Sequence, residues 1–271
     1  MPHVDVPGAR LYYETDGHAS APALLLLHAS IANLRMWDPL ISTLAVDHYV
    51  VRYDARGFGQ SATENLPYRD REDARHVLDH LGVEQAVVVG ASRGGRIGID
   101  LAVETPERVA GLVTIGAGPS GFPDLELTDE EDAFVDRLDA AFQAQDWPAL
   151  NRLDVELWCL GVNRQADVLD PDFVRTAYEL NRPNLAHCTE APIAEPLEPP
   201  AYDRVVDIQV PALVTVGEFD LSEALTKQAY LLNTIPDAAG YIFSDTAHIP
   251  SVENPSEFLE VLTAWLERNG L

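Results

Sequence analysis

A segment in the middle of the chain, Gln85 to Ala102, constrains the fold more than any other part of the sequence. It reads QAVVVGASRGGRIGIDLA: an apolar, mostly β-branched run, then a glycine-rich turn, then apolar residues at helical spacing. A short apolar run that ends at glycine is typical of a strand buried on both faces, and such strands belong to parallel sheets covered by helices. The segment therefore predicts a strand–turn–helix unit of an α/β domain.

The same alternation of strand and helix recurs on both sides of this unit. PALLLLHAS and HYVVRYDARGFGQS predict buried strands that run into loops, and YRDREDARHVLDHLGV predicts a helix that ends at Gly82. After residue 203 the alternation continues with VPALVTVGEFD, LTKQAYLLNTIP, AGYIFSD and a final helix, PSEFLEVLTAWLERN. We therefore predict a mostly parallel central sheet with helices on both faces.

The alternation stops between residues 120 and 203. This stretch begins with Thr128 and Glu131 at the spacing of a capping box, continues as amphipathic helices, and ends in the Pro/Glu-rich linker EAPIAEPLEPPAYD. We predict an α/β core made of residues 1–119 and 204–271, with a helical cap (lid) of residues 120–203 inserted between its strands. Its expected place is over the carboxyl ends of the strands, where open α/β sheets bind ligands.

Composition excludes several classes of protein. The chain has 44 Asp and Glu against 18 Lys and Arg, a formal net charge of −26. Such a field repels nucleic acids and anionic membranes, so we expect neither as a partner. Two cysteines and scattered histidines predict neither a disulfide framework nor a metal site. The chain begins without a basic and then apolar leader, and no apolar run is long enough to cross a bilayer, which favours a cytoplasmic protein.

The turn after the central strand matches G-x-S-x-G at Gly90 to Gly94 and contains Ser92. Glycines at both ends let the backbone approach its neighbours closely, so the serine hydroxyl is raised above the sheet at the start of a helix. There the backbone N–H of Arg93 can stabilise a developing oxyanion. Ser92 is therefore a candidate nucleophile.

A serine needs a base that is oriented by a carboxylate, in the chain order Ser, Asp, His for this type of turn. VTVGEFD places Asp220 just past a buried strand, and FSDTAHIPSVENP places His248 after the next strand. Either residue alone is more often structural, but their order and their positions at strand ends favour a catalytic pair. Asp124, also past a strand, is the alternative acid.

Further residues are candidates for the rest of the site. The loop LLLLHASIANLRMW follows an early strand, and we choose the N–H of Ser30 as the second oxyanion donor. Trp37, Phe122, Trp158 and Phe219 are candidates for an apolar substrate pocket, although aromatic residues at such places are more often plain core.

Taken together, these motifs resemble those of the α/β-hydrolase superfamily, and the resemblance extends over nearly the whole chain. LLLLHAS, RYDARGFGQS, VGASRGG, VGEFD and HIPSVENPSEF carry the resemblance, and RMWDP makes it similar to small bacterial esterases and 3-oxoadipate enol-lactonase-like hydrolases. The resemblance implies a Ser92–Asp220–His248 triad, an oxyanion hole from the N–H groups of Ser30 and Arg93, and a helical cap. The chemistry of such a triad needs no cofactor or metal, so we expect none. The family usually has His-Gly where this chain has His28-Ala29.

We therefore expect hydrolysis of a small carboxylic ester or lactone through an acyl-enzyme on Ser92, by a monomer or homodimer. Carbon–carbon bond hydrolases and cofactor-free perhydrolases use the same triad and stay as alternatives, as does a ligand sensor with vestigial hydrolysis. The side chain of Arg93 either binds a substrate carboxylate or folds into a salt bridge.

Overall fold

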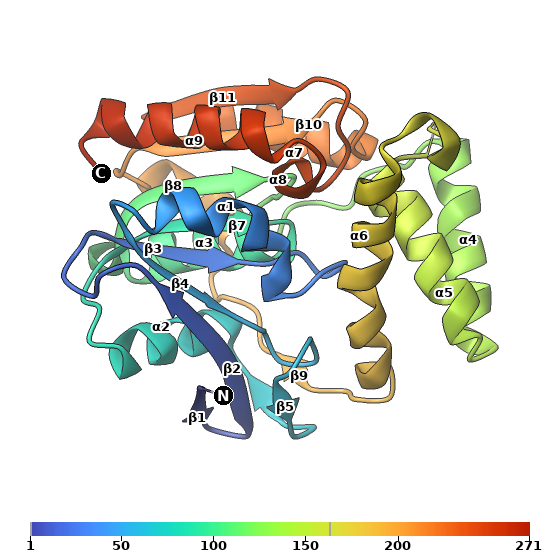
Figure 1. Cartoon of the computed structure of the whole chain (residues 1–271), viewed down its shortest axis with the longest axis horizontal. Helices are drawn as coiled ribbons and strands as arrows, with labels where there is room; N and C mark the ends of the chain where they lie inside the picture. Colours follow the sequence, from blue (N-terminus) through green and yellow to red (C-terminus); the bar gives the residue numbers. More distant parts are fainter. Residues whose placement is uncertain (1, 163) are drawn as a thin grey trace.

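The computed structural model describes residues 2–162 and 164–271, and its centre is one twisted, mostly parallel sheet (Figure 1). The strands follow the order β1-β2-β4-β3-β7-β8-β10-β11, and β5 pairs with β2. Neighbours from β4 to β11 run parallel, whereas β1, β2 and β4 pair antiparallel. The bounds are β1 His3–Val6, β2 Ala9–Asp16, β3 Ala23–Leu27, β4 Tyr49–Tyr53, β5 Ala62–Thr63, β7 Ala86–Ala91, β8 Val109–Ile115, β10 Ala212–Gly217 and β11 Ala238–Phe243.

The sheet separates two hydrophobic cores, as its apolar strands predict. In β3, Leu25 and Leu27 belong to one core, and Leu24 and Leu26 to the other, because successive side chains of a strand point to opposite faces. All four are almost completely buried, and each contributes about 1.5–3 kcal/mol of apolar burial. The fold class predicted from the sequence is confirmed.

Helices cover both faces of the sheet. One core contains side chains of α2 (Asp70–His80), α3 (Arg93–Glu104) and α7 (Ser222–Thr234). The other contains side chains of α1 (Asp38–Leu44), α8 (Pro250–Glu253) and α9 (Pro255–Asn269). Helix α2 ends just before Gly82, whose φ of +68° lies in the region that favours glycine.

In the described part of the chain between β8 and β10, three α-helices are inserted, with shorter helical turns between and after them: α4 (Asp129–Gln143), α5 (Trp147–Asp154) and α6 (Pro171–Asn181). They lie together beyond the end of the sheet toward which β8 and β10 point (Figure 1). Thr128 and Glu131 form both hydrogen bonds of a capping box at the start of α4. The side chain of Glu131 also accepts hydrogen bonds from the N–H and hydroxyl of Ser222, which attach α4 to the start of α7.

The segment predicted to be a linker, residues 190–203, contains a short strand that pairs with a distant strand, and its composition does not predict this pairing. Ile193–Ala194 (β9) pairs in parallel with Pro67–Tyr68 (β6). Because the partners lie more than 120 residues apart in the chain, local sequence carries no signal for this contact.

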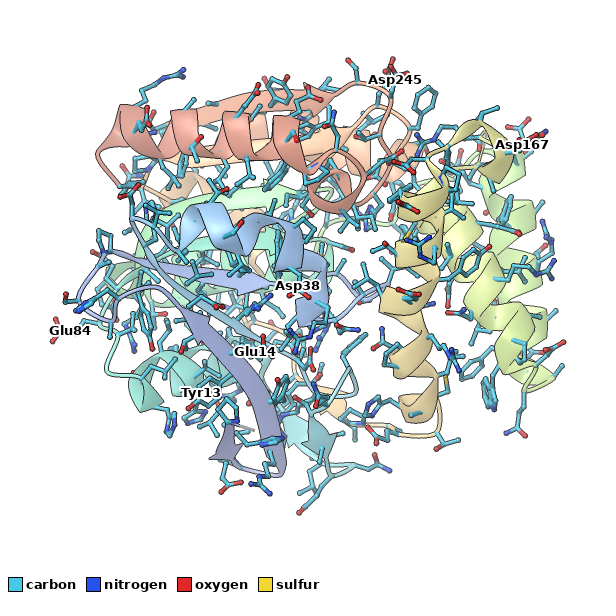
Figure 2. The ribbon with its side chains drawn as sticks, viewed as in Figure 1. Tyr13, Glu14, Asp38, Glu84, Asp167 and Asp245 are labelled. Atoms are coloured by element: carbon cyan, nitrogen blue, oxygen red, sulfur yellow. The ribbon has the colours of Figure 1, made fainter. Side chains whose placement is uncertain are left out.

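In the described part of the chain, no helix is long and apolar enough to cross a membrane. Figure 2 shows Glu84, Asp167 and Asp245 at the outline of the molecule, and all three are exposed. The large negative charge is therefore carried in part by carboxylates at well-separated places on the surface.

Candidate active site

Ser92 occupies a strained turn between β7 and α3. Its φ of 52° and ψ of −117° lie in a region that non-glycine residues rarely adopt. A Cβ on Gly90 would lie 2.3 Å from the carbonyl oxygen of Gly94, and one on Gly94 would lie 2.2 Å from that of Leu27. Both glycines are therefore required by close backbone contacts, and the turn holds Ser92 at the carboxyl end of the central strand.

The candidate base and acid lie together at the same edge of the sheet. His248 follows β11 and Asp220 follows β10, and His248 Nδ1 lies 2.8 Å and 2.9 Å from the two carboxylate oxygens of Asp220. Both side chains are buried, and Asp220 also accepts a hydrogen bond of 2.8 Å from the N–H of Leu221. A carboxylate on Nδ1 leaves Nε2 of the ring as the atom available to a nucleophile.

Gly116 makes room for this pair and was not among the residues that the sequence suggested. It follows β8 with a φ of +55°, and a Cβ there would lie 2.6 Å from a carboxylate oxygen of Asp220 and 3.0 Å from Nδ1 of His248. The signal in the sequence is a glycine directly after the buried strand that precedes the inserted helices.

Two cavities meet at Ser92 and His248. The larger has a volume of about 610 Å³, and the smaller about 190 Å³. Trp158 lines both of them. The candidate nucleophile and base therefore lie where two cavities of unequal volume meet.

Trp158 comes from a π-helical segment, Val155–Leu160, that continues α5 toward the site. Its carbonyl oxygen accepts a hydrogen bond of 3.2 Å from the N–H of His248, and the two rings have centroids 4.9 Å apart. π-Helical turns occur frequently at functional sites because they redirect side chains within a helix.

Of the other three aromatic candidates, one lines a cavity and two do not. Phe122 lines the larger cavity and packs edge-on against Tyr202 and Tyr230. Trp37 does not line either cavity: it directly precedes α1 and is fully buried in the same core as that helix. Phe219 lines neither, and the guanidinium of Arg164 lies 5.1 Å from its ring centroid. These last two side chains therefore belong to core packing and to a cation–π contact, not to the pocket.

The proposed oxyanion donors lie on either side of Ser92. Ser30 lines the smaller cavity, and Arg93, the first residue of α3, lines the larger. Ala29, which stands where the family usually has glycine, is fully buried and is absent from the described residues with positive φ. The alanine methyl group therefore imposes no backbone strain on this loop.

The ring of His28 connects the proposed oxyanion loop to the loop after β4 through two hydrogen bonds. Its Nδ1 lies 2.8 Å from the carbonyl oxygen of Ala29, and its Nε2 accepts a hydrogen bond of 3.0 Å from the N–H of Ala55. Burial lowers the pKa of His28 to about 4, so the ring is neutral and donates through Nδ1. Arg56 is likewise structural, in a buried ion pair with Asp73.

The side chain of Arg93 folds into an ion pair. Its guanidinium lies 2.6 Å from a carboxylate oxygen of Asp70 and donates to the hydroxyl of Tyr68 at 3.1 Å. Arg96 binds the other oxygen of Asp70 at 2.9 Å. Burial alone would raise the pKa of Asp70, but the two arginines outweigh it and the pKa is lowered. The geometry thus favours the salt-bridge alternative over a carboxylate receptor.

Asp154 is a site residue that sequence reasoning missed. It ends α5 and lines the smaller cavity together with Ser30, Ser92, Trp158 and His248. Burial raises the pKa of Asp154 to about 6, and the amide of Asn181 opposes that rise in part. One more aspartate among 44 acidic residues carries no signal in the sequence. Among the described residues, no group of three His, Cys, Asp or Glu side chains is arranged to hold a metal ion.

A serine on a strained strand–helix turn, lining the same cavities as a buried His–Asp pair at the edge of a parallel sheet, is typical of a class of hydrolytic enzymes. A family model described as the alpha/beta hydrolase fold matches residues 22–255. The chain therefore belongs to the α/β-hydrolase family.

Relatives with lactone-related names are among the most similar proteins. The 3-oxoadipate enol-lactonase 2 of Acinetobacter baylyi is 27% identical over 274 residues, which cover 95% of this chain and 93% of the relative. A solved N-acyl homoserine lactone degrading enzyme is 26% identical with a TM-score of 0.75, covering 97% of this chain and 99% of that one. A solved enol-lactonase from Burkholderia xenovorans has a TM-score of 0.79 at 24% identity, covering 98% and 100%, and shows the likeness of fold. These likenesses support a hydrolytic role.

Proposed function

We propose that this chain is a serine hydrolase that cleaves a small carboxylic ester or lactone through an acyl-enzyme on Ser92. The observation that carries the proposal is the hydrogen bond between His248 and Asp220 beside a cavity that Ser92 lines from a strained turn. The names of the relatives, enol-lactonase and lactone degrading enzyme, favour carboxylic esters and lactones as substrates.

In the proposed reaction, His248 takes the proton of Ser92 as the hydroxyl oxygen attacks the carbonyl carbon. Asp220 holds the ring and stabilises its positive charge. The N–H groups of Ser30 and Arg93 stabilise the tetrahedral oxyanion, and loss of one such donor typically costs about 10²–10³ in rate. His248 then protonates the leaving alcohol oxygen. Water, deprotonated by His248, attacks the acyl-enzyme, and the acid departs as Ser92 regains its proton.

Residues 120–203 are proposed to form the cap of this site and one wall of its pocket. Trp158 reaches both cavities from this insertion, and Phe122 lines the larger. The small volume of the second cavity, about 190 Å³, favours substrates with one short half. Arg164, also in the insertion, forms a buried ion pair of 2.6 Å with Glu253 on α8, which attaches this wall to the core.

The test is covalent labelling with a fluorophosphonate, followed by intact-mass analysis and peptide mapping. The expected result is one adduct per chain, on Ser92, and no adduct on Ser92→Ala. Steady-state assays with short aryl esters and simple lactones should show turnover for the wild type and almost none for Ser92→Ala. An adduct at another residue, or an active Ser92→Ala protein, would overturn the proposal.

A further inference from the structure

Asp154 and Trp158 lie four residues apart on the same stretch of helix, and both line the smaller cavity. Side chains at this spacing share one helix face. The cap therefore presents an aromatic ring and a carboxyl group side by side to the space next to Ser92.

Several buried carboxylates of this protein are held by arginines. Asp70 pairs with two arginines, Asp73 pairs with Arg56, and Glu253 pairs with Arg164. Asp154 forms no ion pair among the described residues, and its side chain does not cap the π-helical segment that it precedes. The amide of Asn181 offers a hydrogen bond, but it does not offset the cost of burying the carboxyl group, so Asp154 is a candidate for a role in the site.

The cavity itself limits what can meet this carboxyl group. Its volume is about 190 Å³, and Ile31 and Trp158 supply its apolar walls. A substrate whose carbonyl lies at Ser92 has one part on each side of that carbonyl. The smaller part is the one that fits this cavity. An ionised carboxylate only accepts hydrogen bonds, so it favours a neighbouring donor and disfavours a neighbouring anion.

We infer that Asp154 is a specificity-determining residue that selects substrates whose smaller half carries a hydrogen-bond donor, a hydroxyl or an ammonium group. This inference rests on the proposed function, because it assigns a role in the same reaction. Since the pKa of Asp154 is about 6, the group is ionised near pH 8 and accepts from either donor.

The test compares phenyl butanoate with phenyl 3-hydroxybutanoate and phenyl 3-aminobutanoate at about pH 8, by the rate of phenol release. Because each substituent also changes the intrinsic reactivity of the ester, the informative quantity is the ratio of kcat/KM for each donor ester to that for phenyl butanoate. This ratio is compared between the wild type and variants.

In Asp154→Ala, both ratios are expected to fall by about 10- to 100-fold, the loss typical of a hydrogen bond to a charged group. Asp154→Asn keeps the shape of the side chain and an acceptor oxygen, so it should retain part of the hydroxyl preference and lose the ammonium preference. Glu156→Gln is the matched control: Glu156 lies two residues away, outside both cavities, and faces Arg137 at 3.9 Å. Its ratios should equal those of the wild type.

Equal ratios in the wild type and Asp154→Ala would overturn the inference, and so would a uniform fall in kcat/KM for all three esters, which indicates a structural role. If the wild type cleaves phenyl butanoate and Ser92→Ala does not, the proposed function stands whatever the ratios are. If the wild type cleaves none of the three esters, this inference fails. If it also cleaves no simple lactone, the proposed function fails with it.

Discussion

The backbone N–H of His248 donates a hydrogen bond of 3.2 Å to the carbonyl oxygen of Trp158, so the loop that carries the candidate base is tied directly to the inserted helices. The two rings also pack at 4.9 Å. Because one residue of the insertion both holds this loop and lines both cavities, changes in the insertion should alter the chemistry as well as the size of the pocket.

Truncation of Trp158 should change the preferred length of the acyl chain. The wild type is expected to favour short p-nitrophenyl esters and to lose activity steeply with chain length, because the smaller cavity is only about 190 Å³. In Trp158→Ala the two cavities join, so the optimum should move to longer chains. Phe219→Ala is the control, since Phe219 lines neither cavity. A wild-type optimum at long chains would show that the pocket has been misread.

Asp220→Asn should lower kcat by about 10⁴, because an amide stabilises neither the required tautomer of His248 nor its positive charge. Asp124→Asn is the matched control, since Asp124 lines the larger cavity while Asp220 holds the hydrogen bond to His248. Initial rates with one short ester measure both variants. Near-normal activity in Asp220→Asn together with a large loss in Asp124→Asn would show that Asp124, and not Asp220, is the acid that supports His248.

Asp70→Asn should destabilise the protein by about 3–5 kcal/mol, because it leaves the buried guanidinium of Arg93 without its carboxylate. Urea unfolding followed by fluorescence measures the effect. Arg93→Met should also lower stability, yet leave unchanged the relative KM for neutral and carboxylate-bearing esters. A selective rise in KM for the carboxylate-bearing esters would instead make Arg93 a receptor for a substrate anion.

Asp154→Asn should stabilise the protein in a pH-dependent way. The pKa of Asp154 is about 6 in the folded protein, above its ordinary value of 3.8, so folding favours the protonated form. The wild type therefore loses stability as the pH rises from about 4 to 6, and the full cost, about 3 kcal/mol, persists above that range. Asparagine does not ionise and avoids this cost.

Urea unfolding at about pH 5 and pH 8 checks this prediction. The gap in unfolding free energy between Asp154→Asn and the wild type should be larger at pH 8. Glu156→Gln should show no such growth of the gap. A gap for Asp154→Asn that is equal at both pH values would mean that the carboxyl group is ionised with its ordinary pKa.

The sequence by itself determined the fold class, because that depends on local patterns. The apolar runs of β3 and β7 predict strands buried on both faces, and the spacing in α9 predicts a helix that starts after Asn254. The candidate nucleophile is also a local feature, since Gly90 and Gly94 are required by close contacts within and beside one turn.

Only the tertiary structure decided which side chains share a cavity. Trp37 and Trp158 look alike in the sequence, but one lies in the core and the other beside His248. The side chain of Arg93 turns to Asp70, and Asp154 reaches the space next to Ser92, through contacts between segments far apart in the chain. Periodicity specifies which face of an element is apolar; it does not specify which distant element that face meets, so packing alone made these assignments.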